Sequence, residues 1–313
     1  MAFKILFCGT PQFAVPTLEA LHHDPRFEVV CVFTQPDRPS GRGQKLQLSP
    51  VKKRALELGL SVEAPEKASA KEVVKAVQDM DSDVAVVVAY GQILSQAFLD
   101  SFVHGCVNVH SSLLPRWRGA APIQRALMSG DKITGVSLQK VVKKLDAGPV
   151  IAAKSIPLCI EIGALELTEK LSVLGGELLL QSLPSYLKGE GNLKSQDESL
   201  VTYAAKIEKS EGLIDWKLSA NTIHNKIRGL NMGGPFAYTM FHDKNLKIHK
   251  SYPCSLSEPS RFGKVLRVEK DHFVVACGDG ALELWVVQPE SKARMNADDF
   301  IRGYHLKKGD CFV

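Results

Sequence analysis

The sequence predicts an α/β protein with a mostly parallel sheet and helices on both faces, followed by a small β-barrel domain. Apolar strand segments alternate with helical segments in the first part of the chain, which is typical of parallel βαβ winding. A continuous apolar run at residues 83–90 indicates a central strand covered on both faces. After residue 245, short strand segments separated by Gly, Asp and Asn turns indicate a barrel. The expected architecture is therefore Rossmann-like first and OB-like second.

Length and composition set the broad class of the protein. The 313 residues favour two domains, and 45% hydrophobic with 23% charged residues is ordinary for a soluble globular protein. A net charge of +5 permits acidic partners without demanding them. The seven cysteines include no C-x-x-C pair, which disfavours a disulfide framework or a zinc ribbon and indicates a reducing compartment.

The amino-terminal residues do not resemble a targeting segment. Residues 1–7 lead straight into a strand, without the basic stretch of a secretion signal. No apolar run in the sequence reaches the roughly 18 residues of a membrane span. We expect a cytoplasmic protein without a membrane partner, and a monomer.

The first βαβ units follow from patterns near the amino terminus. In order, we expect a strand at 4–8, a turn at 9–11, a helix at 16–22, a strand at 28–34, a helix at 51–58 and a short strand near Val62. Gly9 stands alone, and without a G-x-G-x-x-G pattern NAD(P) binding is disfavoured. Gly9 is then part of a tight turn between strand and helix.

The connection at residues 35–50 is long, because strand-to-helix loops usually have about two to six residues. Residues 36–54 carry six basic side chains against one acidic side chain. A glycine-flanked arginine beside lysines suits the binding of a phosphate backbone. A solvated surface loop is the alternative, and residue types alone leave both interpretations open.

Two strands in the middle of the chain bring polar residues to the edge of the sheet where ligands bind. The strand at 83–90 ends in a loop at 91–94, a helix follows at 95–102, and the next strand contains Asn108 and His110. Side chains two residues apart on a strand share one face. The carboxyl ends of parallel strands form the ligand crevice. We therefore expect an amide donor and an acid/base group together in this crevice.

The remainder of the chain provides a loop acid and the second domain. Asp146 lies in a Gly/Pro-bounded loop between two β segments, where an acid is usually a turn former unless it reaches His110. The polar composition after residue 188 indicates a linker, so we expect domains at 1–188 and 209–313 joined by 189–208. The other expected elements are helices at 121–128, 165–187 and 220–230 and strands at 134–142, 246–249, 263–268, 272–277 and 282–287.

The residue types around His110 allow several chemistries. His104, Cys106 and His110 share one strand face, but no second Cys/His cluster in the sequence completes a zinc site. G-x-S-x-G is absent, and no feature marks Cys106 as a reactive thiolate. Acyl transfer without a covalent enzyme intermediate remains, with Asn108 and protonated His110 donating to an oxyanion and Asp146 stabilising the imidazolium. A core histidine with a turn aspartate is an equally open interpretation of these residues alone.

Specific motifs occur in both parts of the chain. They are Gly9-Thr10-Pro11, FTQPDRPSGRG at 33–43, VVAYG at 87–91, NVHSSLLPRWRGAAPIQ at 108–124, LDAGP at 145–149, DESLVTYA at 197–204 and IDW at 214–216. Together they resemble the folate-dependent formyltransferase family, and within it the methionyl-tRNA formyltransferases. The resemblance is highly specific, covers the first domain and continues into the second.

The resemblance implies formyl transfer from 10-formyltetrahydrofolate, as formyl donor and co-substrate, to the α-amino group of methionyl initiator tRNA, without a metal. The family's catalytic asparagine, histidine and aspartate fall on Asn108, His110 and Asp146. Its folate pocket falls on Val88, Ala89, Tyr90, Gly91, Gln92, Ile93, Leu94, Ser112, Leu113, Leu114 and Pro115. Its tRNA-binding insertion falls on residues 36–49, with contacts from Arg38, Arg42 and Lys45, and the barrel is implied to hold the tRNA from its other side.

Two positions depart from the family pattern. Lys144 stands where a glycine usually precedes the Leu-Asp of the aspartate loop, which affects the conformation of the loop rather than the acid. Residues 230–236 lack the tryptophan often found there, so no contact residue is assigned in the second domain. The alternatives are a folate-dependent N-formyltransferase acting on an amino sugar or nucleotide amine, and a non-catalytic tRNA-binding protein. The basic loop and the barrel distinguish the first alternative, and turnover distinguishes the second.

Overall fold

The chain folds into two compact units, which are described one at a time. The computed structural model describes residues 2–40, 45–255 and 260–313. The first unit comprises Met1–Gly119, Thr134–Ile156 and Thr168–Tyr203, and the second comprises Ala120–Ile133, Pro157–Leu167 and Ala204–Val313. Within the described ranges, no helix combines the length and the apolar character needed to cross a membrane.

The first unit is built on a sheet with the strand order β10-β9-β7-β6-β1-β2-β5. β1 (Phe3–Gly9) pairs in parallel with β2 (Phe27–Phe33) and with β6 (Val84–Val88), and β2 pairs in parallel with β5 (Val62–Glu63). β7 (Cys106–His110) is parallel to β6, whereas β9 (Ile133–Lys140) runs antiparallel to β7 and is followed by β10 (Val150–Pro157) at the edge. The predicted α/β class with a mostly parallel sheet is confirmed.

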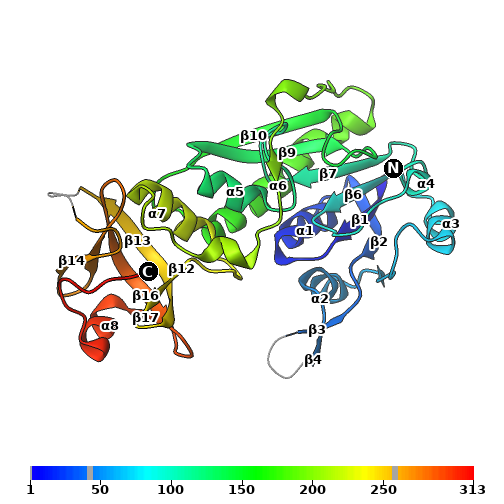
Figure 1. Ribbon diagram of the computed structural model, residues 1–313. Coiled ribbons are helices and arrows are strands. Elements are labelled where there is room, and N and C mark those ends of the chain that lie inside the picture. Colours follow the sequence, from blue (N-terminus) through cyan, green and yellow to red (C-terminus); the bar gives the residue numbers. More distant parts are fainter. Residues whose placement is uncertain (1, 41–44, 256–259) are drawn as a thin grey trace. The chain divides into compact units, whose positions relative to one another are not determined.

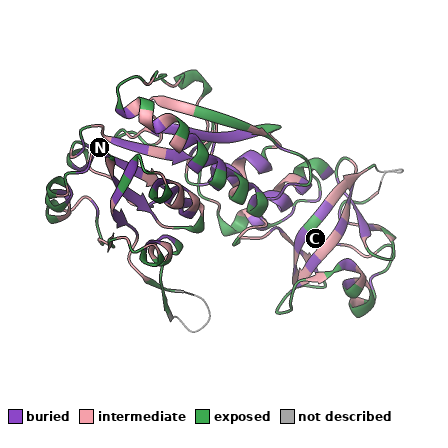
Figure 2. Cartoon of the chain, turned by 180° about the vertical axis from the view of Figure 1, so that it is seen from behind, coloured by how far each residue is buried: buried purple, intermediate pink, exposed green. Residues whose placement is uncertain are grey.

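Helices cover both faces of this sheet (Figure 1). On one face, side chains of α3 (Lys71–Asp79) and α4 (Gln96–Leu99) form one buried cluster with strand residues that include Cys106. On the other face, α6 (Ala164–Leu187) comes so close that a Cβ on Gly175 would lie 2.7 Å from Cγ1 of Val109. Because side chains alternate along β7, Asn108 and His110 point to the α3–α4 side, like Cys106. Figure 2 shows the strands of this sheet as largely buried.

Local chemistry explains the shorter elements of the first unit. A 3-10 turn (Gln12–Ala14) leads into α1 (Val15–His23), and Ser49 caps α2 (Pro50–Glu57) by accepting a hydrogen bond from the Lys52 N–H at 3.1 Å. β8 (Arg118–Gly119) pairs with β11 (Tyr203–Ala204) after a 3-10 turn at Glu198–Leu200.

The elements of the first unit that were not predicted include α3 and an antiparallel ribbon of β3 (Arg38–Ser40) and β4 (Lys45–Gln47) inside the long connection. Figures 1 and 2 show this ribbon extending away from the sheet of the first unit. The described part of the predicted basic segment at 38–40 and 45–47 therefore lies on this ribbon.

The second unit is a curled antiparallel sheet with helices against it, which confirms the predicted small β domain. Its strand order is β12-β13-β16-β15-β14, and β17 pairs with β16. The strands are β12 (Tyr238–Phe241), β13 (Lys244–Cys254), β14 (Val265–Val268), β15 (Phe273–Ala276), β16 (Ala281–Pro289) and β17 (Met295–Asn296). The helices are α5 (Pro122–Met128), a 3-10 turn at Lys209–Gly212, α7 (Ala220–Gly229) and α8 (Ala297–Tyr304).

An aromatic cluster fills the core of the second unit. The buried ring of Phe273 stacks on Phe300 and Phe312, with ring centroids 5.8 and 5.7 Å away. Phe241 contacts the same two rings, at centroid distances of 5.6 and 5.0 Å. The rings come from β12, β15, α8 and the carboxyl-terminal segment, so one cluster joins elements distant in sequence.

We predict that Phe273→Ala destabilises the protein by about 3–5 kcal/mol, because it removes a fully buried ring from this cluster. Urea unfolding followed by near-UV circular dichroism measures the change. Phe262→Ala is the matched control, since Phe262 is 47% exposed and its loss should cost less than about 1 kcal/mol. Equal costs for the two variants would contradict the assignment of Phe273 to the core.

Candidate active site

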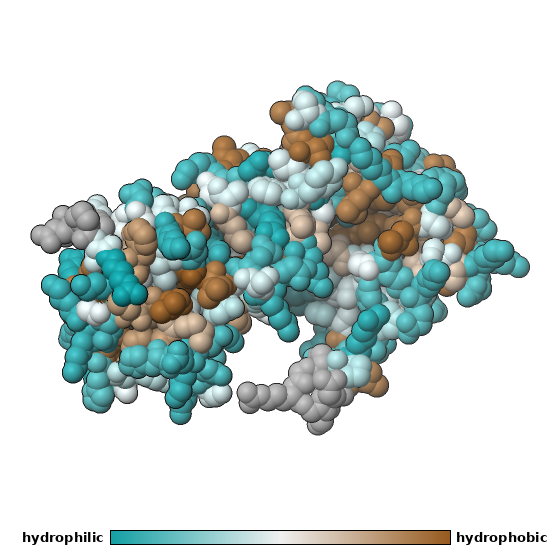
Figure 3. Space-filling model, in the orientation of Figure 1, coloured by the Kyte–Doolittle hydropathy of each residue, from teal (hydrophilic) through white to brown (hydrophobic). Residues whose placement is uncertain are grey.

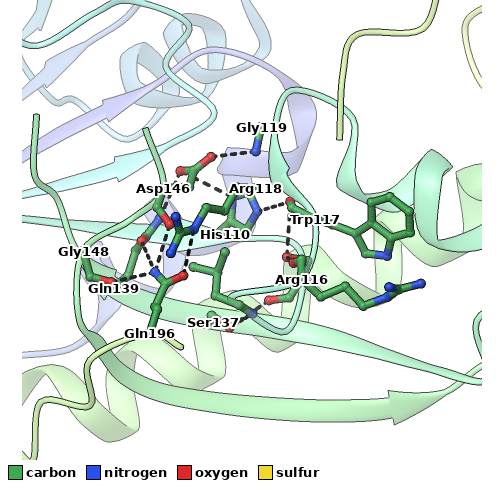
Figure 4. Close-up of polar contacts among 12 residues, drawn as sticks. His110, Arg116, Trp117, Arg118, Gly119, Ser137, Gln139, Asp146, Gly148 and Gln196 are labelled. Carbon is green, nitrogen blue, oxygen red and sulfur yellow. Dashed lines mark hydrogen bonds and ion pairs between the residues drawn. The ribbon is translucent and has the colours of Figure 1, made fainter. Parts of the chain in front are cut away.

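β7 presents the polar residues expected at the crevice, and β9 lies beside them. Asn108 is in register with Gln139 of β9, and His110 is in register with Ser137. Directly opposed residues of an antiparallel pair point to the same face. These four side chains therefore share one face of the sheet, and Figure 4 shows His110, Ser137 and Gln139 together with Asp146.

His110 is held by a main-chain carbonyl. Its side chain is 7% exposed, and its Nε2 lies 2.9 Å from the carbonyl oxygen of Trp117 (Figure 4). A carbonyl oxygen only accepts hydrogen bonds, so Nε2 carries a hydrogen and donates it. Nδ1 is consequently the ring atom that gains or loses a proton.

Asp146 lies on the Nδ1 side of His110. Its Oδ1 is 3.8 Å from Nδ1, which is longer than a hydrogen bond but close enough for an ion pair with a protonated ring. The Gly119 N–H donates to Oδ2 at 2.9 Å, and Gln139 Nε2 donates to Oδ1 at 3.0 Å. The backbone of Asp146 is left-handed, with φ of 47°, a conformation that Asp adopts more readily than most residues. The loop acid thus reaches the histidine.

Asn108 has a half-buried side chain two residues before His110. Among the described residues, its side-chain amide finds no hydrogen-bond partner. The amide is therefore available to a bound ligand on the face that His110 and Gln139 share.

Hydrogen bonds from serine side chains to the main chain hold the turn after β7. Ser137 Oγ donates to the carbonyl of Ser112 at 2.8 Å and accepts from the Leu114 N–H at 3.0 Å. Ser112 Oγ donates to the Arg116 carbonyl at 2.6 Å. The side chains of Leu113, Leu114 and Pro115 remain half-buried, whereas that of Ser112 is fully buried.

The residues of the loop after β6 that are expected to bind folate fall into two groups, one with buried or bonded side chains and one that faces outward. The side chains of Val88 and Tyr90 are buried, and burial raises the pKa of the Tyr90 hydroxyl. Gln92 supports the loop by accepting from the Ala68 N–H at 2.7 Å and donating to the Pro65 carbonyl at 2.8 Å.

The other residues of this loop face outward. Ala89, Gly91 and Ile93 are exposed, and Leu94 is half-buried. Ile93 is an apolar side chain with 89% exposure. Figure 3 shows apolar surface gathered over the part of the first unit where β6 and β7 lie.

The residues expected to contact tRNA are placed in part. Arg38 is exposed at the start of β3, and Lys45 begins β4. Arg42 lies outside the described residues. The described residues of this segment at 38–40 and 45–47 thus lie on an extended ribbon of the first unit.

This geometry also bears on thiolate chemistry and on metal binding. Cys106, on the same strand face, is buried, and burial raises the pKa of its thiol, which disfavours the thiolate form. Within residues 2–40, 45–255 and 260–313, no group of three or more His, Cys, Asp and Glu side chains is placed to hold a metal ion.

Sequence reasoning missed three residues of the site. Gln139 bonds to Asp146, and the signal for it was a polar residue at period two from Ser137 on β9. Arg118 and Gln196 bond to each other across 78 residues of sequence, and no local pattern marks Gln196.

Comparison with known proteins decides the family. Residues 1–183 match the family described as formyl transferase, and residues 206–305 match its C-terminal domain. A methionyl-tRNA formyltransferase of Bdellovibrio bacteriovorus is 50% identical over 312 residues, which cover 98% of each chain. This chain belongs to the methionyl-tRNA formyltransferase family. It is therefore a formyl-transferring enzyme, as the motifs predicted.

Solved structures show the same fold at lower identity. The sugar 3N-formyl transferase WlaRD aligns with a TM-score of 0.67 and 18% identity over 94% of this chain and all of its own. HypX from Aquifex aeolicus, solved in complex with tetrahydrofolic acid, aligns with a TM-score of 0.63 and 15% identity over the whole chain and 51% of its own. At these identities the likeness of this formyltransferase to them concerns the fold alone.

We predict that Gly148→Ala lowers formyl transfer about 100-fold, because a shift of about 1 Å in a catalytic loop has effects of that size. A Cβ on Gly148 would lie 1.7 Å from the carbonyl oxygen of Lys140, so the Asp146 loop would have to move away from β9. Single-turnover assays measure the effect. Gly303→Ala in α8 is the control, since a Cβ there meets nothing within 4 Å. Wild-type activity of the Gly148 variant would show that the loop position is unimportant.

Proposed function

We propose that this enzyme transfers the formyl group of 10-formyltetrahydrofolate to the α-amino group of methionyl initiator tRNA, giving N-formylmethionyl-tRNA for translation initiation. Full-length relatives named methionyl-tRNA formyltransferase support this substrate pair. The observation that carries the chemistry is the ionisable Nδ1 of His110, 3.8 Å from Asp146 and on the strand face that it shares with Asn108.

The first role in the proposal is stabilisation of developing charge. As the amine nitrogen forms a bond to the formyl carbon, negative charge develops on the formyl oxygen. The Asn108 amide and the protonated Nδ1 of His110 donate hydrogen bonds to that oxygen. Asp146 stabilises the positive charge on the imidazole ring. Donors of this kind each contribute about 100- to 1,000-fold in turnover.

The second role is proton transfer. The attacking amine must lose a proton, and the nitrogen that leaves the formyl carbon must gain one when its bond to that carbon breaks. Because the Nε2 hydrogen of His110 is committed to the Trp117 carbonyl, proton exchange involves Nδ1 or a water held by Asp146. Both groups lie on the same side of the ring, so the proton need not travel far.

The folate-binding part of the proposal uses the two loops beside β7. Residues 88–94 and 112–115 flank the strand end, and the exposed Ala89, Gly91 and Ile93 offer main chain and apolar surface to a flat ring. The Asn108 amide supplies a polar contact at the formyl end. The residues present therefore fit the flat ring of a folate, whose faces contact apolar surface and whose edges form hydrogen bonds with main chain.

The tRNA-binding part of the proposal uses charge. Arg38, Arg42 and Lys45 on the basic segment would neutralise backbone phosphates, each by an electrostatic contact that weakens with salt. We further propose a catalytic domain at 1–188, a linker at 189–208, a tRNA-binding domain at 209–313, and a cytoplasmic monomer.

Substrate choice is tested by offering the enzyme 10-formyltetrahydrofolate with charged initiator tRNA, charged elongator methionine tRNA, or amino sugars. We expect efficient formylation of the initiator alone, measured as acid-precipitable labelled formyl group. Faster formylation of an amino sugar would replace the proposed function with that of a sugar N-formyltransferase. Retention of tRNA without turnover would identify a binding protein.

We predict that Asp146→Asn lowers turnover by at least about 1,000-fold, because the ring would lose the charge that stabilises its protonated form. The fold should be retained, since Asn has nearly the same size, and circular dichroism with thermal unfolding checks this. Turnover is measured with saturating substrates. Near-normal formylation by this variant would refute the assignment of Asp146.

A further inference from the structure

The loop that carries Asp146 is tied down by the side chain of Gln196. Gln196 Nε2 donates to the main-chain carbonyl of Asp146 at 2.9 Å and to that of Gly148 at 2.7 Å (Figure 4). On its other side, Gln196 Oε1 accepts from Nε of Arg118 at 3.0 Å. One amide therefore connects the loop to a buried arginine from another part of the first unit.

Donor and acceptor types permit one orientation of each amide in this group. Arg118 Nε can only donate, so Gln196 must turn Oε1 toward it and Nε2 toward the carbonyls. An ionised Asp146 can only accept, so Gln139 must turn Nε2 toward the carboxylate. Gln139 Oε1 then faces Gln196 Nε2 at 3.3 Å, a longer contact that shares the two amide hydrogens with the carbonyls of Asp146 and Gly148. The donors therefore point in one direction, from Arg118 through the two glutamines to the carboxylate.

The series of hydrogen bonds begins at Arg118, whose position is fixed by burial and by its partners. Its side chain has 0% exposure, and its Nη2 bonds to Oε1 of Glu198 at 2.9 Å. The buried cation needs these acceptors, because a charge removed from water is costly without partners. The next residue in the chain is Gly119, whose N–H donates to the other oxygen of Asp146. The Gly119 N–H of β8 therefore positions Oδ2, whereas Oδ1 is held by Gln139 of β9, which Gln196 connects to Arg118.

Lys144, on the same loop as Asp146, forms an ion pair with Glu198. Its Nζ donates to Oε2 of Glu198 at 2.7 Å, so Glu198 bridges Lys144 and Arg118. Hydrogen bonds from Arg118 and then Lys144 lower the pKa of Glu198 to about 2, and the bridge is ionised at neutral pH. This contact uses the lysine that stands where the family pattern has glycine.

We infer that Gln196 is a positioning residue for formyl transfer: it orients Gln139 and the Asp146 loop so that the carboxylate faces Nδ1 of His110. This inference rests on the proposed role of Asp146. Besides Asn108, His110 and Asp146, formyl transfer would then also require the series of hydrogen bonds that begins at Arg118.

The test substitutes the donor of Gln196. Gln196→Glu keeps size and the contact to Arg118, but it places an acceptor against the carbonyls of Asp146 and Gly148. We expect turnover to fall about 10- to 100-fold, with KM for both substrates within about twofold of wild type. Gln196→Met, which neither donates nor accepts at that distance, should show a similar fall. Gln78→Glu, on the exposed side of α3, is the matched control and should retain wild-type turnover.

A double-variant cycle separates positioning from a general structural effect. In the Asp146→Asn background, Gln196→Glu should lower the residual single-turnover rate by less than about twofold, because both changes act through the same carboxylate. An independent loss of the same size as in the wild-type background would overturn the inference, as would wild-type turnover of either Gln196 variant. If Gln196→Glu unfolds at the assay temperature, Gln196→Met decides by the same criteria.

The same cycle distinguishes failure of this inference from failure of the proposed function. Near-normal turnover of Asp146→Asn alone refutes the proposed site, and the inference falls with it. A large loss in Asp146→Asn together with wild-type turnover in both Gln196 variants refutes the positioning role and leaves the proposed function standing.

Discussion

The contact on which the site depends is a carboxylate held beside an imidazole ring where little water reaches either group. The side chains of Asp146 and His110 are 12% and 7% exposed. A carboxylate removed from water needs donors in its place, and each hydrogen bond to a charged group contributes about 1.5–3 kcal/mol. The Gly119 N–H and Gln139 supply those donors. The pairing of β7 with β9 and the close return of the loop at Gly148 bring Gln139 and the carboxylate together.

Much of the fold could be predicted because buried strands show characteristic apolar runs and period-two patterns in the sequence. The apolar run that became β6 indicated a strand covered on both faces, and period two placed Asn108 and His110 on one face of β7. The missed helix α3 is short, but Val73, Val74 and Val77 have the spacing of one helical face, so its apolar pattern was present in the sequence and was overlooked. The ribbon of β3 and β4 lies within a segment rich in Pro and Gly, which indicates a loop.

The candidate site could be predicted in part from local pattern and not where it joins distant segments. Period two placed Asn108 and His110 on one strand face, whereas the residue types alone did not connect Asp146 to them and the resemblance to the family did. Gln196 lies in a polar segment interpreted as linker, and its role depends on Arg118, 78 residues earlier. Lys144 was seen as a departure from a glycine pattern, but its partner Glu198 is 54 residues away. Such pairs follow from topology, which periodicity does not reveal.

The carbonyl that sets the tautomer of His110 belongs to the main chain of Trp117. Substitutions and changes of length in the turn after His110 therefore have different effects on the site. Replacing the Trp117 side chain leaves the accepting oxygen in place, provided that the backbone keeps its left-handed φ of 63°. Glycine or asparagine would suit this backbone conformation, although either would lose the contact of the Trp117 ring with the Arg116 guanidinium. Insertion or deletion between His110 and Trp117 would instead move the carbonyl away from the ring. The length of this turn is under stronger constraint than the identity of the residue that supplies the oxygen.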